Sequence, residues 1–208
     1  TGTGGILRIG TAAARTVAVG DFMAPAVTGF ADVSVNGTVQ PSIVVLTGGQ
    51  SGILVDGWQI FGDAAKPLVL GTNFSASFGG VGNGLLFQGT AITVGGTAAI
   101  AGGTGTVVFR TLSLSVDANA VLSGRLARVE APSGASIVVG SGEAAGTLYV
   151  SPTLLRELGV VGTTARFERV AVGAAAGQSG GSVTVAEALS VNRPLELGGS
   201  SLTIAATV

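Results

Sequence analysis

The chain has 208 residues, of which 36 are Gly and 6 are Pro, and this argues against a mainly helical fold because both residues disfavour helix interiors. Only 10% of the residues are charged, and 10 basic side chains nearly balance 11 acidic ones, so no strong positive field is available to hold a nucleic acid or an anionic membrane surface. Cys and His are both absent from the sequence, which removes the thiolate nucleophile, the usual proton shuttle and the two commonest zinc ligands. We therefore expect a non-enzymatic protein with no cofactor, no metal and no nucleic-acid partner.

The side chains that can form a core are mostly small. Hydrophobic residues make up 47% of the chain and aromatic residues only 5%, so we expect thin layers of Val, Ala, Leu and Ile without large aromatic anchors. The segment 67–109 carries no charge, but Gly, Asn, Gln and Thr interrupt it. No run of about 18 consecutive apolar residues occurs, and we therefore expect no membrane span.

Short runs of strand-forming residues recur along the whole chain, bounded by Gly, Asn, Asp or Ser. Successive runs start about ten residues apart, a cadence that fits a sandwich, a barrel or a β-solenoid. The expected strands are 6–9, 16–19, 31–35, 42–46, 52–55, 67–70, 84–87, 91–94, 106–109, 111–116, 126–129, 136–139, 146–150, 165–172, 182–185, 188–191, 194–197 and 201–204.

Three features favour the β-solenoid. Runs such as 112–116, Leu-Ser-Leu-Ser-Val, alternate apolar with small polar residues, so that one face can enter a narrow core. The strands are too short and too many for a sandwich of about seven to nine strands, and small connecting residues let coils stack about 4.8 Å apart. With about 20 residues per coil, the chain would form roughly ten coils and a rod on the order of 50 Å long. We predict an all-β parallel solenoid, a single domain over 1–208 and a segment of a longer repetitive protein.

One segment predicts a helix. Ser151 is a good N-cap, Pro152 suits the first helical position and Gly159 is a typical stop, so we expect a short helical turn near 152–158 that projects sideways from the rod. In the strand that follows, Phe167 and Val170 have opposite parity. A bulge at residues 168 and 169 would place both side chains on one face.

The candidate binding residues are Asp56, Trp58, Asp63 and Lys66. Glycosidic cleavage needs paired carboxylates, lyases need a base with charge neutralisation, and an indole beside carboxylates can stack on a sugar ring. The structural alternative is a protruding loop whose Trp and Phe side chains pack against a coil, and we favour that alternative. Two further groups of alternating charges, 125–130 and 166–168, are expected to be solvated ion pairs on exposed strand faces.

Two glycine-rich segments resemble phosphate-binding loops. They are 79–84, Gly-Gly-Val-Gly-Asn-Gly, and 102–106, Gly-Gly-Thr-Gly-Thr. Neither is followed by a helix with a Lys, so the anion-binding geometry of such loops is not predicted. The chain also lacks the repeated Gly-Gly-x-Gly-x-Asp nonapeptide of calcium-binding β-rolls, and we expect no calcium site.

The C-terminal third carries a resemblance to known repeats. The segments are GTLYVS at 146–151, LLREL at 154–158, VAVG at 170–173 and GGSVTV at 180–185, followed by ALSV at 188–191, LEL at 195–197 and SLTI at 201–204. These segments resemble the degenerate repeats of filamentous-haemagglutinin-like exoproteins, which are exported by two-partner secretion. The likeness is best over 137–204. The Asn-Pro-Asn motif of the family's secretion domain is not found, so this chain resembles a segment of the rod, and no functional residue is carried over.

The resemblance implies a right-handed parallel β-helix in a secreted protein of the bacterial cell surface that acts as an adhesin or an extended stalk. Expected partners are other copies of the chain, through end-to-end or lateral packing, and host or surface glycans. Two alternatives remain open at this point. One is a carbohydrate-active β-helix that binds or cleaves a polysaccharide with the segment from Asp56 to Lys66, and the other is the shaft of a phage tail fibre.

Overall fold

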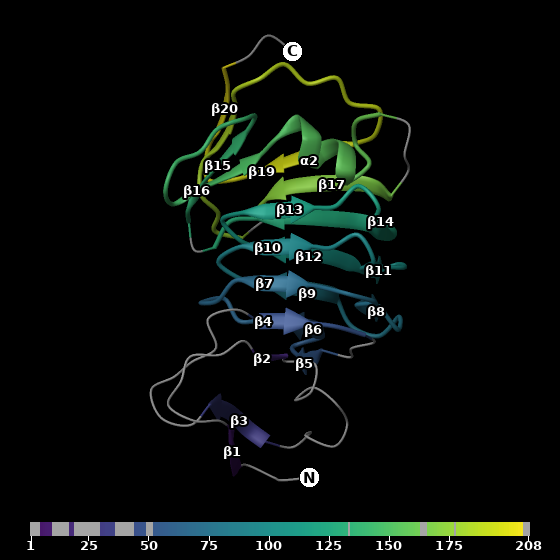
Figure 1. Cartoon of the computed structure of the whole chain (residues 1–208). Coiled ribbons are helices and arrows are strands. Elements are labelled where there is room, and N and C mark those ends of the chain that lie inside the picture. The colour runs from purple at the N-terminus through teal and green to yellow at the C-terminus, as the bar shows by residue number, and fades with distance from the viewer. Residues whose placement is uncertain are drawn as a thin grey trace.

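A computed structural model describes residues 5–9, 17–18, 30–35, 44–48, 52–132, 134–162, 166–176 and 178–205 (Figure 1). Within these residues the chain is all-β with a single short helix. The strands are β1 (Gly5–Ile9), β2 (Val17–Ala18), β3 (Phe30–Val35), β4 (Val44–Leu46), β5 (Ile53–Val55), β6 (Trp58–Phe61), β7 (Leu68–Leu70), β8 (Ser75–Ser77), β9 (Gly84–Gln88), β10 (Ile92–Val94), β11 (Ala99–Ala101), β12 (Thr106–Arg110), β13 (Leu114–Val116), β14 (Val121–Glu130), β15 (Ser136–Val139), β16 (Thr147–Val150), β17 (Phe167–Gly173), β18 (Val183–Val185), β19 (Leu195–Gly198) and β20 (Leu202–Ile204); the helix is α2 (Pro152–Glu157).

The strands form parallel sheets. A five-stranded sheet has the order β13-β10-β7-β4-β2, a four-stranded sheet has the order β16-β15-β18-β20, and β1 pairs with β3. The largest sheet has the order β19-β17-β14-β12-β9-β6-β5, and β8 and β11 continue it beside the first part of β14. Every pairing between described strands is parallel except β5 with β6. The expected all-β class and the parallel strand direction are therefore confirmed.

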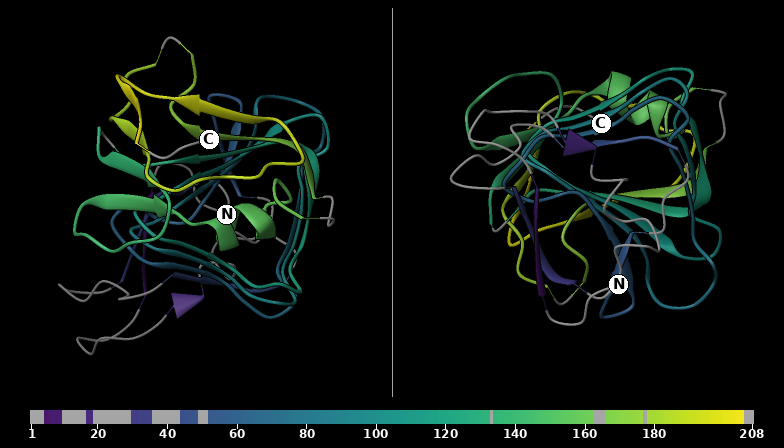
Figure 2. Two further views of the ribbon diagram at one scale, coloured as in Figure 1. Left: turned by 90° about the horizontal axis from the view of Figure 1, so that it is seen from above. Right: turned by 60° about the horizontal axis from the view of Figure 1, so that its bottom comes forward.

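Equivalent strands recur at a regular spacing and pair without a shift of register. Ile92 in β10 pairs with Leu68 in β7 on one side and with Leu114 in β13 on the other. Ile100 in β11 pairs in the same way with Ala76 in β8 and Leu122 in β14. The number of residues between paired positions is the same as for Ile92. The repeat is slightly longer than the coil length that the sequence predicted. Figure 1 shows these strands as successive levels, and Figure 2 shows from above that the levels lie over one another.

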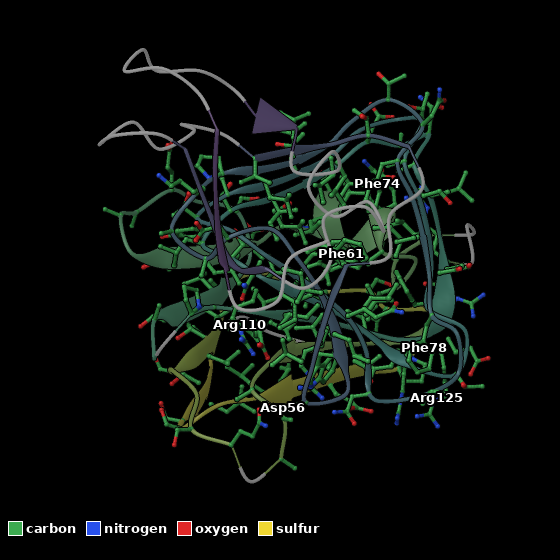
Figure 3. All side chains as sticks on the ribbon, turned by 90° about the horizontal axis from the view of Figure 1, so that it is seen from below. Asp56, Phe61, Phe74, Phe78, Arg110 and Arg125 are labelled. Atoms are coloured by element: carbon green, nitrogen blue, oxygen red, sulfur yellow. The ribbon has the colours of Figure 1, made fainter. Side chains whose placement is uncertain are left out.

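The core consists of rows of buried side chains, in which equivalent residues of successive levels lie over one another. In β10 the pattern is buried, exposed, buried, so that Ile92 and Val94 enter the core and Thr93 faces outward. The largest sheet adds a column of phenylalanines. The rings of Phe61 and Phe87 stack at a centroid distance of 4.9 Å, and those of Phe87 and Phe109 at 5.5 Å. Phe74 packs edge-on against Phe61 at 5.8 Å (Figure 3). The expectation of a core without aromatic anchors is therefore wrong.

Helix α2 lies over the edge of the five-stranded sheet. The Leu154 N–H donates to the Ser151 hydroxyl oxygen at 3.2 Å, and Pro152 occupies the first turn, as the sequence predicted. The side chains of Leu154 and Leu155 are buried, and the helix contacts β13. The helix therefore covers the sheet edge and does not project from it.

Strand β14 turns from one part of the large sheet to another at Gly124. Its residues 121–123 pair with β11, whereas its residues 126–130 pair with β12. The offset between β14 and β17 is the same at the pair Gly124–Phe167 as at the pair Leu126–Arg169. No residue is inserted at this point, so the bulge predicted near residue 168 is wrong. Phe167 lies opposite Gly124, the residue at which β14 turns, and its side chain is buried in the core.

Candidate functional site

Asp56 and Trp58 belong to a β-hairpin at the edge of the largest sheet. β5 and β6 pair antiparallel, with Val55 opposite Trp58. The two turn residues have positive φ angles, 49° at Asp56 and 79° at Gly57. An Asp-Gly pair with this geometry is a favoured two-residue hairpin turn, because Gly has no Cβ and Asp tolerates the left-handed region. The sequence contained this signal, and the prediction of a protruding loop missed it.

The glycine-rich segment 79–84 holds the hairpin turn. The Asn83 side-chain amide donates to the Asp56 carbonyl oxygen at 3.0 Å, and the Asn83 N–H donates to the Gly57 carbonyl oxygen at 2.6 Å. A Cβ on Gly82 would lie 2.3 Å from the same carbonyl oxygen, and φ at Gly82 is 104°. The absence of a side chain at Gly82 therefore permits the backbone of this segment to lie close to the hairpin.

Asp63 and Lys66 lie in one turn at the other end of β6. The Asp63 carboxylate accepts a hydrogen bond from the Ala65 N–H at 2.9 Å, and the Asp63 carbonyl oxygen accepts one from the Lys66 N–H at 3.0 Å. Strand β6 separates this turn from the hairpin turn, and a strand of its length spans about 13 Å. Carboxyl pairs that cleave glycosidic bonds are about 5 to 9.5 Å apart. The structure thus brings Asp63 and Lys66 together and keeps Asp56 with Trp58 at a distance from them.

Trp58 contributes to an apolar strip on the outer face of the hairpin. Residues directly opposite in an antiparallel pair share a face, so Ile53 lies beside Ile60, and Val55 beside Trp58. Ile53 is 59% exposed and Val55 is 45% exposed, while Trp58 and Ile60 are half-buried. On its other side Trp58 pairs with Gly84, which has no side chain to cover the indole. Such a strip can contact an apolar surface or the face of a sugar ring.

A cleft lies where three strands of the same sheet end. Gln88, Arg110 and Glu130 end three adjacent strands and are paired in register. The Arg110 guanidinium forms an ion pair with Glu130 at 2.6 Å, and Glu130 is buried. These side chains line a cleft of about 320 Å³ together with Ile137 and Gln178. The cleft offers a polar wall to a ligand, and no sequence motif pointed to it.

The charged groups pair with other partners than the sequence suggested. Glu130 pairs with Arg110, whereas the Arg128 guanidinium donates to the Gly173 carbonyl oxygen at 3.0 Å. Arg166 pairs with Glu157 at 3.5 Å and not with Glu168. In each case the partner belongs to another element of the fold, so alternation within one strand could not identify it.

The described residues contain no group of three or more His, Cys, Asp or Glu side chains that could hold a metal ion. Among the helices of the described segments, none combines the length and the apolar character needed to cross a membrane. No protein-family model, curated protein or solved structure matches the chain. The fold and these sites define the class: an all-β protein of in-register parallel sheets with polar clefts at the strand ends.

Proposed function

We propose that the chain is a structural and adhesive segment of a bacterial extracellular surface fibre, built as a right-handed parallel β-helix and working without catalysis. The observation that supports this proposal is the in-register stacking of equivalent strands at a regular repeat, from β7 through β10 to β13. A repeat of this kind lengthens by adding levels, and each level buries the apolar row of the next. The resemblance of 137–204 to filamentous-haemagglutinin-like repeats points to the same role.

The edge strands of two sheets supply surfaces for contact between copies. β19 and β20 each end the order of their sheets, and Leu202 and Ile204 in β20 are 52% and 56% exposed. At the other end of the largest sheet, Leu54 in β5 is 68% exposed. A strand edge offers unpaired N–H and C=O groups that can pair with another chain. We therefore propose that copies of the chain associate through these edges.

A charge-substitution pair tests the proposed association. Wild-type protein at micromolar concentration should form elongated assemblies that sedimentation velocity and electron microscopy detect. The double variant L202K/I204K should remain a monomer of 20.1 kDa, because Lys on an edge strand opposes pairing. The control V121K alters an equally apolar residue, 64% exposed, on the side of the molecule, and should assemble like the wild type. A stable wild-type monomer with no extended form would contradict the association.

Adhesion needs its own measurement. Beads coated with folded wild-type chain should attach to epithelial cells more strongly than beads coated with heat-unfolded chain. V121K should attach like the wild type if the ends or the clefts carry the contact. Equal attachment by folded and unfolded chain would argue against the adhesive role and leave the structural role intact.

A further inference from the structure

We propose that the cleft between Arg125, Arg166 and Arg193 is a binding site for a tetrahedral oxyanion, a sulfate or phosphate group. The cleft has a volume of about 260 Å³, and its lining includes these three arginines and Glu168. Figure 3 shows Arg125 on a different side of the molecule from Arg110, so this cleft is separate from the one beside Glu130.

The three arginines come from adjacent strands of the largest sheet. Arg125 lies in β14 directly after the turn at Gly124, Arg166 directly precedes β17, and Arg193 lies shortly before β19. β14 pairs with β17, and β17 pairs with β19. The register of these pairings sets Glu168 opposite Arg125 and Arg193 opposite Glu168, and the sheet thus gathers the three arginines and one carboxylate around the cleft, although they come from different parts of the sequence.

Arg166 is the fixed part of the site. Its side chain is only 7% exposed; one terminal nitrogen, Nη2, donates to the Ala118 carbonyl oxygen and lies 3.5 Å from a Glu157 carboxylate oxygen. The other terminal nitrogen, Nη1, is buried and has no hydrogen-bond partner among the described residues. A buried donor without a partner is costly. An oxyanion that enters the cleft and displaces the groups covering Nη1 would supply the missing acceptor.

The other two arginines provide charge that the described residues do not neutralise. Neither Arg125 nor Arg193 forms an ion pair or side-chain hydrogen bond with a described residue, whereas Arg169 pairs with Glu196 at 2.9 Å. Three guanidinium groups face the carboxylates of Glu168 and of Glu157, which pairs with Arg166, so the formal charge of the site is net positive by one. Guanidinium groups bind sulfate and phosphate oxygens through paired hydrogen bonds. The positive charge and the unpaired donor thus favour an anion whose oxygens accept several hydrogen bonds.

The test is a titration of the purified chain with inorganic sulfate and inorganic phosphate, with sodium chloride of equal ionic strength as the reference. NMR shift changes should locate binding at residues 124–125, 167–168 and 193. R125Q and R193Q should each weaken binding at least tenfold. K66Q is the matched control, because it removes one positive charge from a distant turn and should bind like the wild type. Shifts that chloride reproduces, or equal binding by all variants, would overturn the proposal.

Two esters distinguish the sources of the anion. Tighter binding of glucose 6-sulfate than of glucose 6-phosphate would assign a sulfated glycan, the reverse would assign a phosphorylated one, and binding of the inorganic ions alone would assign the free anion. R166Q should abolish binding, and if it fails to fold, R125Q and R193Q still decide the question. The site does not rest on the proposed fibre role. Repeating the titration with L202K/I204K separates a failure of assembly from a failure of binding.

Discussion

The segments 52–130 and 134–205 differ in how regularly their strands stack. In the first, three successive levels repeat with equivalent residues over one another, and the phenylalanine column ties the levels together. In the second, α2 covers the edge of the five-stranded sheet, and a new four-stranded sheet begins with β15 and β16. Three of the four ion pairs between described residues involve only residues of the second segment.

The difference teaches where such a molecule acquires chemistry. In the five-stranded sheet the outward-facing row of the regular levels consists of the small residues Val69, Thr93 and Ser115, which stack at the spacing of adjacent strands. Where the repeat is interrupted, no such row has to be continued. Arg166 and Arg193 both lie in the irregular segment, and with Arg125 they form the proposed anion site.

The largest effect is expected in the regular segment. Phe87 is fully buried and stacks between Phe61 and Phe109. F87A should lower the free energy of unfolding by about 3 to 5 kcal/mol, because it leaves a cavity in the column. V172A, which alters a buried residue of the same sheet in the second segment, should cost less, about 1 to 3 kcal/mol. Urea denaturation measures both, and an equal cost would show that the phenylalanine column has no special role.

The next effect concerns backbone spacing between levels. A Cβ on Gly84 would lie 1.9 Å from the Thr106 carbonyl oxygen, and φ at Gly84 is 147°. G84A should therefore lower the free energy of unfolding by at least about 2 kcal/mol. The control G79A places its Cβ in open space and should change stability by less than about 0.5 kcal/mol. A tolerated G84A would mean that β9 and β12 can separate without cost.

At the junction of the two segments, the buried carboxylate matters more than an exposed one. E130Q removes the charge that faces Arg110 at 2.6 Å, where the Glu130 side chain is 11% exposed. We expect a loss of about 1 to 2 kcal/mol in thermal or urea unfolding. The comparison variant E143Q alters an exposed residue and should have no measurable effect. Identical unfolding curves for the two variants would show that the ion pair adds no measurable stability, as is common for solvated pairs.

The smallest effect lies in the helix. S151A removes the side-chain oxygen that accepts the Leu154 N–H, and should cost about 1 kcal/mol. T153A changes an exposed residue in the same helix without altering the cap, and should be neutral or slightly stabilising because Ala favours helix. Amide hydrogen exchange should show faster exchange in α2 for S151A alone. Faster exchange throughout the first segment would show that α2 supports the whole molecule.

Sequence reasoning located most strands, because their apolar residues alternate or cluster between Gly and Asn. It missed β6, because it treated 56–63 as a loop, and also β8 and β11, Ser-Ala-Ser and Ala-Ile-Ala, in which one small or medium residue per strand enters the core. Such short strands with a single buried position carry no periodic signal, and only pairing with neighbouring levels defines them as strands. Conversely, residues 188–191 look like a strand but form none, since they cross between β18 and β19 at the end occupied by α2.

The candidate sites were harder to predict. The segment from Asp56 to Lys66 was identified, but strand β6 separates its two ends, which local spacing in sequence could not show. Neither cleft was predicted, because each is assembled from residues on different levels. Arg125 and Arg193 become neighbours only through the stacking order β14-β17-β19. Sequence reasoning grouped Arg125 with Glu130, but the structure pairs Glu130 with Arg110 and Glu196 with Arg169.

The reversed direction of β5 gives the molecule a polarity. A neighbour that adds to the largest sheet at β19 meets a strand aligned with all those beneath it, whereas a neighbour at β5 meets the one strand that runs the opposite way. The two edges of this sheet therefore differ in strand direction. A strand that paired with β19 could continue the parallel arrangement, whereas β5 offers the edge of the single antiparallel pair.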